Sequence, residues 1–136
     1  MNMKKSHPKK QQIFSPGLRG RIWIDGPEGT FLGYGRIVLL ERVREYGSIS
    51  QAAKSMDMSY RHAWELVASM NGQAPVPLVE AATGGKGGGG ARLSDDGEKA
   101  IDLFWKLHAD FQTFLAEEEK ILDLSKIKAK KRAKTN

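Results

Sequence analysis

Two short segments with helical spacing of apolar residues lie close together near the middle of the chain. Ser50 precedes the first, residues 51–56, and Ser59 precedes the second, residues 60–70. A serine in this position predicts a helix N-cap, because its hydroxyl accepts a hydrogen bond from a backbone N–H that the helix leaves unpaired. The two residues between the segments leave room only for a tight turn. This pattern predicts a helix-turn-helix.

The second predicted helix has two different faces. Ala63, Val67 and Met70 repeat at helical spacing and predict a buried stripe. Tyr60 and Arg61 stand in the first turn, the part of a recognition helix that reaches base edges. Arg61 is a candidate for a bidentate contact with guanine, and a phosphate clamp or free solvent are the alternatives. The DNA-contact candidates in this stretch are Ser50, Gln51, Ser59, Tyr60, Arg61 and Glu65.

A run that is almost pure glycine follows, between two strand candidates at residues 78–81 and 91–93. Glycine loses more chain entropy on ordering than any other residue, so such a tip has no role in a core. It suits a place where one backbone approaches another, and we expect a wing along DNA phosphates. Trp64 is expected to pack beneath this wing, with a position at the groove edge as the alternative. The wing residues are Gly84, Gly85, Gly87, Gly88, Gly89 and Gly90 by backbone, and Lys86 and Arg92 by charge.

The glycine run is not expected to bind a nucleotide. A phosphate-binding loop needs Lys followed by Ser or Thr, whereas Lys86 is followed by Gly87 and then by a strand. Asp95, Asp96 and Glu98 begin a helix and have no histidine nearby to form a general acid–base pair. We therefore expect no enzyme activity.

A hairpin and a helix are predicted before the helix pair. Residues 21–25 and 30–34 are β-rich and joined by four turn residues, and the hairpin aromatics, Trp23 and Phe31, are expected to pack on a helix. The helix should run from Gly35 or Arg36 to Tyr46, with Gly47 as a left-handed cap. Its inner stripe is Ile37, Leu40 and Val43, widened by Leu39.

A long helix is predicted from Ser94, its N-cap, to about Leu124, with acidic residues in the first turn where they favour the helix dipole. Its apolar stripe is too long for one small domain to cover. We therefore expect a two-fold dimer through this helix, and packing on its own domain is the alternative. The dimerisation candidates are Ile101, Phe104, His108, Phe111 and Leu115.

The net charge of +6 on 136 residues is concentrated at the two ends. We expect a disordered basic tail over residues 1–17 and a basic tail over 125–136, which leaves residues 18–124 as one domain. The alternative to solvated tails is nonspecific attraction to phosphates.

Several classes of site and location are excluded. Cysteine is absent, which rules out disulfides and thiol chemistry within the sequence. No run approaches the roughly 18 apolar residues that span a membrane, and no signal-peptide core is present, so a cytoplasmic location is expected. His7, His62 and His108 lack partners at metal-ligand spacing, so no metal site is expected.

The segment GSISQAAKSMDMSYRHAW resembles the helix-turn-helix of LysR-type regulators, and more closely that of ModE-type molybdate-responsive regulators. The resemblance covers about residues 35–120 and implies a winged-helix DNA-binding domain, dimerisation, and control of genes of molybdate uptake and molybdenum enzymes, often by repression. The residues that carry it are Ser59-Tyr60, Ala63-Trp64, Met70-Asn71, Pro77-Leu78-Val79, the run from Ala82 to Ala91, and Leu93-Ser94.

Members of that family carry their oxyanion sites in a C-terminal pair of small β-barrels, whereas this sequence ends in a lysine-rich segment at Asn136. No residue here corresponds to such a site, so no cofactor is expected in this chain. Binding of molybdate is suggested by the family resemblance alone.

The expected fold is mainly α with small β: a winged helix-turn-helix with an N-terminal β-hairpin, a Gly-rich wing and a long C-terminal dimerisation helix. The expected function is sequence-specific binding of double-stranded DNA by a homodimeric transcriptional repressor, whose helix 59–71 enters the major groove while wing 83–91 lies on the backbone. The alternative is a dimeric winged-helix adaptor that binds another protein.

Overall fold

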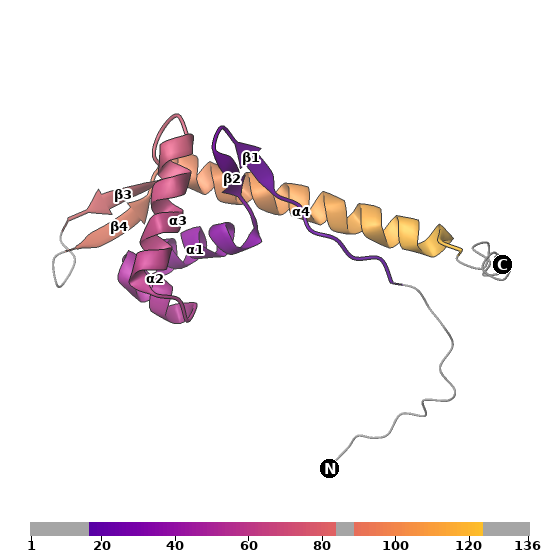
Figure 1. Ribbon diagram of the computed structural model, residues 1–136, viewed down its shortest axis with the longest axis horizontal. Coiled ribbons are helices and arrows are strands. Elements are labelled where there is room, and N and C mark those ends of the chain that lie inside the picture. Colours follow the sequence, from indigo (N-terminus) through magenta and orange to yellow (C-terminus); the bar gives the residue numbers. More distant parts are fainter. Residues whose placement is uncertain (1–16, 84–88, 124–136) are drawn as a thin grey trace, which may run out of the picture. The chain divides into compact units, whose positions relative to one another are not determined.

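The computed structural model describes residues 17–83 and 89–123, with the element order β1-β2-α1-α2-α3-β3-β4-α4 (Figure 1). The described residues fall into two units, one of residues 21–112 and the other of residues 17–20 and 113–123. Lys86 and four wing glycines, Gly84, Gly85, Gly87 and Gly88, lie outside the described residues, as does almost all of both predicted tails.

The N-terminal hairpin is shorter than the sequence predicts. Strand β1 (Ile24–Gly26) pairs antiparallel with β2 (Gly29–Leu32), so only two residues form the turn. Gly29 has a φ of 103°, which L side chains rarely adopt. The prediction that Trp23 packs on a helix is wrong in that its side chain is 60% exposed, whereas Phe31 packs against the core.

Helix α1 (Tyr34–Tyr46) begins one residue earlier than predicted, at a residue that the sequence assigns to the hairpin. Its C-cap is Gly47, with a φ of 68° and an N–H that donates to Val43 O at 2.8 Å, which confirms the predicted left-handed cap. The predicted inner stripe is also confirmed, because all four side chains are 0% exposed: Ile37, Leu39, Leu40 and Val43.

The helix pair is α2 (Ile49–Ser55) and α3 (Tyr60–Gln73), and the start of α2 differs from the prediction. Ser48, and not Ser50, is the N-cap: its extended backbone turns the hydroxyl toward Gln51 N, which donates to it at 3.0 Å. Ser50 therefore lies inside the first turn. Both serines precede the apolar residues of this helix, so the sequence pattern alone does not show which of them is the cap.

The second cap is confirmed, since Ser59 Oγ accepts from His62 N at 3.0 Å. The turn between α2 and α3 passes through Asp57, which has a φ of 54°. Among the described residues, no other residue except glycine has a positive φ. Asp tolerates this conformation better than most residues, which allows the tight turn that the sequence predicts.

Strands β3 (Val79–Ala82) and β4 (Gly90–Leu93) pair antiparallel. Helix α4 (Asp95–Ile121) follows, and Ser94 is its cap as predicted, because Ser94 Oγ accepts from Gly97 N at 3.1 Å. The helix ends three residues before the predicted Leu124.

The core of the 21–112 unit lies between α1, α2, α3 and the first turns of α4. Its largest fully buried side chains include Phe104, Leu40 and Met70. Arg36 links the hairpin to α3 at the edge of this core, where Nη1 donates to Ser69 Oγ at 3.0 Å and to Phe31 O at 3.4 Å. Desolvation by burial lowers the pKa of the Arg36 guanidinium. Within the described residues, no helix has both the length and the apolar composition to cross a bilayer.

Candidate nucleic-acid interface

Helix α3 presents one continuous exposed face. Its core side is formed by Ala63, Val67 and Met70, which are 0%, 4% and 0% exposed, as the sequence predicts. Five exposed positions follow at spacings of one, three and four residues, so they lie together on the opposite side of the helix, and His62 and Gly72 are exposed as well. The five are Tyr60, Arg61, Trp64, Glu65 and Ala68.

The centre of this face is the Arg61–Glu65 pair. Arg61 Nε lies 3.2 Å from Glu65 Oε2, and the two side chains are 83% and 53% exposed. An exposed pair at this helical spacing contributes only about 0.3–0.5 kcal/mol. Arg61 can therefore exchange this carboxylate for a base or a phosphate at little cost in free energy.

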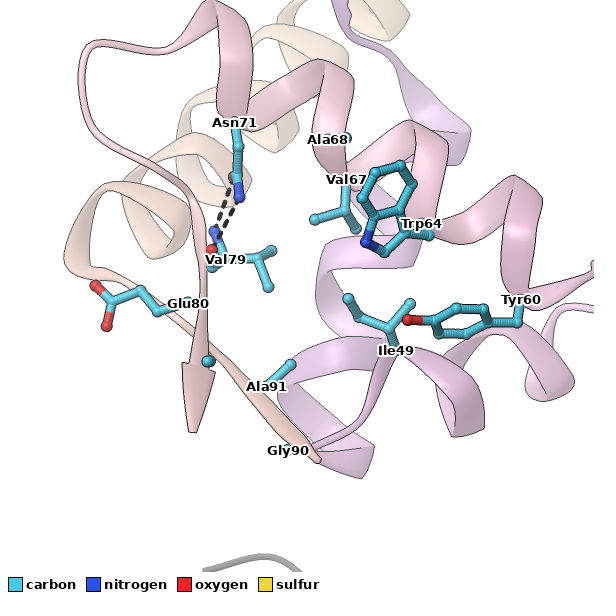
Figure 2. Close-up of a pocket in the computed structure, with 11 residues that line it drawn as sticks. Ile49, Tyr60, Trp64, Val67, Ala68, Asn71, Val79, Glu80, Gly90 and Ala91 are labelled. Carbon is cyan, nitrogen blue, oxygen red and sulfur yellow. Dashed lines mark hydrogen bonds between the residues drawn. The ribbon is translucent and has the colours of Figure 1, made fainter. Parts of the chain in front are cut away.

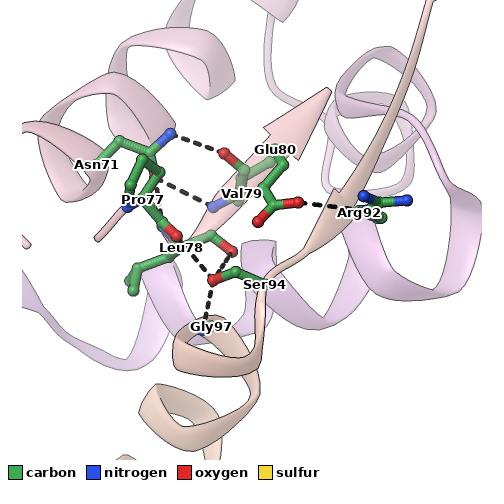
Figure 3. A network of polar contacts seen from close by, with 8 residues as sticks. All are labelled: Asn71, Pro77, Leu78, Val79, Glu80, Arg92, Ser94 and Gly97. Carbon is green, nitrogen blue, oxygen red and sulfur yellow. Dashed lines mark hydrogen bonds and ion pairs between the residues drawn. The ribbon is translucent and has the colours of Figure 1, made fainter. Parts of the chain in front are cut away.

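The wing is attached to α3 by the side chain of Asn71 (Figure 3). Its Nδ2 donates to Val79 O at 2.9 Å, and its Oδ1 accepts from Leu78 N at 2.8 Å and from Val79 N at 3.1 Å. One side chain thus satisfies three backbone groups where β3 begins. Because Asn71 belongs to α3, the position of the wing is determined relative to the exposed face of that helix.

Ser94 attaches the other side of the wing to α4. Its Oγ donates to Pro77 O at 2.7 Å while accepting from Gly97 N, and its backbone N donates to Leu78 O at 2.9 Å. Strand β4 is also bonded to the end of α1, through Ala91 N and Gly47 O at 3.0 Å. The described wing strands are therefore held by three helices.

The predicted charge on the described part of the wing is partly balanced. Arg92 and Glu80 lie opposite each other in the β3–β4 register, with Arg92 Nε 3.3 Å from Glu80 Oε1. Arg92 is 66% exposed, so the pair leaves its remaining guanidinium N–H groups accessible to a phosphate.

A pocket of about 310 Å³ lies between α3 and the wing (Figure 2). Trp64 lines this pocket on the wing side of α3, as expected for packing beneath the wing. Its side chain is nevertheless 51% exposed, as expected for the alternative position at the edge of the groove. The lining residues are Ile49, Tyr60, Trp64, Val67, Ala68, Asn71, Val79, Glu80, Ala81, Gly90 and Ala91.

The remaining DNA-contact candidates lie on α2 and at the start of α3. Ser50 and Gln51 are exposed in the first turn of α2. Ser59 is exposed as well, but its hydroxyl is occupied by the cap of α3. Asn71 bonds α3 to β3, and β3 pairs with β4, which carries Arg92. The structure therefore places Arg92 on the hairpin that is attached to α3, while Lys86 lies outside the described residues.

The five dimerisation candidates do not share one environment. Ile101 and Phe104 are 3% and 1% exposed and belong to the core of their own chain, so their side chains do not face solvent. His108 packs edge-on against Trp105, with ring centroids 5.3 Å apart. Phe111 is partly buried, and Leu115 is 7% exposed.

Sequence reasoning missed two features of this region. Leu103 and Leu107, one turn apart on α4, are 50% and 37% exposed, although the predicted stripe does not include them. The role of Asn71 was also missed, although an asparagine at the end of a helix and before a proline-rich turn is a residue type that bonds nearby backbone groups. In the described part of the chain, no cluster of three or more His, Asp or Glu residues is placed to hold a metal ion.

Residues 35–98 match the family described as bacterial regulatory helix-turn-helix protein, lysR family. The chain is 40% identical over 95 residues to the molybdenum transport protein ModE of Azotobacter vinelandii, a match that covers 70% of this chain and 35% of that protein. It is 51% identical over 69 residues to the transcriptional regulator ModE of Yersinia pestis, covering 51% of this chain and 26% of that protein.

The DNA-binding transcriptional dual regulator ModE of Escherichia coli is 49% identical over 69 residues, which is 51% of this chain and 26% of that protein. The chain thus spans about a third or less of the length of these curated relatives. The matched region contains the helix pair, the wing and the start of α4. Residues 35–98 are therefore a winged helix-turn-helix domain of the bacterial lysR regulatory family, of the type found in ModE proteins.

Proposed function

We propose that this chain is a sequence-specific regulator of transcription that binds double-stranded DNA as a homodimer. In this proposal α3 enters the major groove and the wing lies on the phosphate backbone. The observation that carries it is the bonding of Asn71 to Leu78 and Val79, which joins the exposed face of α3 to the wing. A single surface of this kind suits simultaneous contact with base edges and backbone.

The homodimer is supported by Leu103 and Leu107 of α4. Two leucines exposed to 50% and 37%, one helical turn apart, are typical of a helix face that packs against a partner. Because Ile101 and Phe104 are used by the chain's own core, the partner contact is proposed for these leucines together with the neighbouring candidate His108.

The proposed targets are genes of molybdenum metabolism, and the proposed effect is repression. The names of the relatives support the first point, since they include a molybdenum transport protein and transcriptional regulators. Repression is the simplest consequence of a dimer that occupies a promoter, because it excludes other proteins from the same duplex. No cofactor is proposed for the described residues.

Selection of bound sites from random duplexes tests this function. We expect an inverted repeat whose half-sites are about 10 bp apart or a multiple of this, bound by two chains per duplex. The logarithm of affinity should fall linearly with the logarithm of salt concentration, by about 0.9 per phosphate contact. The alternative, an adaptor that binds another protein, predicts little salt dependence and no enriched site.

Arg61→Ala should relax base preference at one position of each half-site. A bidentate arginine–guanine contact contributes about 1–3 kcal/mol of discrimination, so the variant should lose affinity for the selected site and retain it for random duplexes. Lys86→Ala is the matched control, since loss of a phosphate contact weakens all sequences alike. Fluorescence anisotropy with both duplexes measures this, and an equal loss on both for Arg61→Ala contradicts base reading.

A further inference from the structure

Two large aromatic side chains stand exposed at the pocket between α3 and the wing. Tyr60 and Trp64 are 55% and 51% exposed and lie one helical turn apart (Figure 2). With Ala68, a further turn along, they form an apolar row on α3. Exposed apolar groups that gather at a pocket mark a contact surface more often than a packing defect.

Most of the side chains that line the pocket are apolar. Asn71 and Glu80, the polar side chains that line it besides the two aromatic residues, already have partners in the wing backbone and in Arg92. An apolar group that packs against the other side chains therefore gains free energy from the removal of its surface from water. The remaining walls are Ile49, Val67, Ala68, Val79, Ala81, Gly90 and Ala91.

The apolar row runs beside the Arg61–Glu65 pair on the same exposed face of α3. If this face enters the major groove, as the proposed function requires, the pocket meets base edges there. The apolar group that base pairs present in the major groove is the C5 methyl of thymine. No other base offers an apolar group at this edge in unmodified DNA, so the methyl group is the part of a base pair that matches the apolar side chains of the pocket.

We propose that the pocket receives the C5 methyl group of one thymine in each half-site, and that Trp64 and Tyr60 are specificity-determining residues that contact it. This inference rests on the proposed function. It adds an apolar contact to the recognition of bases, which the sequence assigns to polar side chains. It also gives Trp64 a role at the DNA surface.

The test uses the wild-type chain and the duplex selected by it. Each thymine of a half-site is replaced in turn by uracil, which removes only the methyl group. We expect one thymine position per half-site at which affinity falls about fourfold, the fold-change that corresponds to the loss of one buried methyl group. Substitution in both half-sites should multiply the two losses, to about fifteenfold.

Variants assign the effect to the pocket. Trp64→Ala should bind thymine and uracil duplexes equally, and Trp64→Phe should retain part of the difference. Trp23→Ala is the matched control, because Trp23 is 60% exposed in the same unit and does not line the pocket, so it should keep the full difference. Thermal unfolding of each variant verifies that the fold is intact.

The possible failures are distinct. Selective duplex binding with uracil tolerated at every position overturns this inference and leaves the proposed function standing, whereas the absence of selective binding overturns both. A thymine preference that survives in Trp64→Ala excludes Trp64 as its source. A change in the molecular mass of DNA-free Trp64→Ala, measured by sedimentation equilibrium, assigns the pocket to a contact between copies and overturns the inference.

Discussion

Asn71→Ala is expected to lower the free energy of unfolding by about 2–4 kcal/mol and to abolish selective DNA binding. The asparagine satisfies Val79 O, Leu78 N and Val79 N, and alanine leaves all three without it. Each partly buried backbone group left unpaired costs about 1–3 kcal/mol, with water recovering part of this at the exposed edge. The wing should then lose its fixed position beside α3.

Chemical denaturation measures the loss of stability, and hydrogen exchange at the Leu78 and Val79 amides locates it. Asn71→Asp should be intermediate, since its carboxylate still accepts from both N–H groups but cannot donate to Val79 O. Gln73→Ala is the control, because Gln73 bonds the hairpin residues Glu28 and Thr30 instead. If Asn71→Ala keeps both its stability and its selective binding, Asn71 does not position the wing.

Gly97→Ala is expected to destabilise the fold by about 2–3 kcal/mol, although alanine ordinarily favours a helix over glycine by about 1 kcal/mol. A Cβ at Gly97 would collide with the backbone oxygen of Leu78 and would lie 3.2 Å from Leu93 Cβ. Leu78 O cannot move away freely, because it accepts from Ser94 N at the start of α4. The substitution therefore separates α4 from the wing.

Gly72→Ala provides the matched comparison, since it lies in α3 and a Cβ there has nothing within 4 Å. That variant should be neutral or stabilised by up to about 1 kcal/mol. Thermal unfolding of both variants measures the difference. A Gly97→Ala protein as stable as Gly72→Ala contradicts the close approach of α4 to Leu78.

Local patterns predict the elements of this domain well. The buried stripes of α1 and α3 follow from helical spacing, and Gly47, Ser59 and Ser94 cap the helices that the sequence assigns to them. These features depend on residues within a few positions of one another, so the sequence contains the information directly. The error at α2 is of the same local kind, because Ser48 and Ser50 both satisfy the pattern of a cap.

Longer-range features are harder to predict. The apolar stripe of α4 does not indicate which of its members face the chain's own core, and Ile101 and Phe104 proved to be buried there. Leu103 and Leu107 are exposed although they are as apolar as the buried residues. Periodicity identifies a face of a helix, but burial depends on which other elements pack against it.

The amino-acid sequence by itself determined the helix pair, the caps at Gly47, Ser59 and Ser94, and the order of strand and helix that makes a winged helix-turn-helix. Only the tertiary structure decided how the wing is held, through Asn71 and Ser94, and which side chains remain at the surface of α3 and α4. The physical reason is the distance along the chain between the residues that interact. Caps and stripes arise from neighbours in the chain, whereas the wing bonds and the pocket at Trp64 require backbone and side chains from separate elements to meet in space.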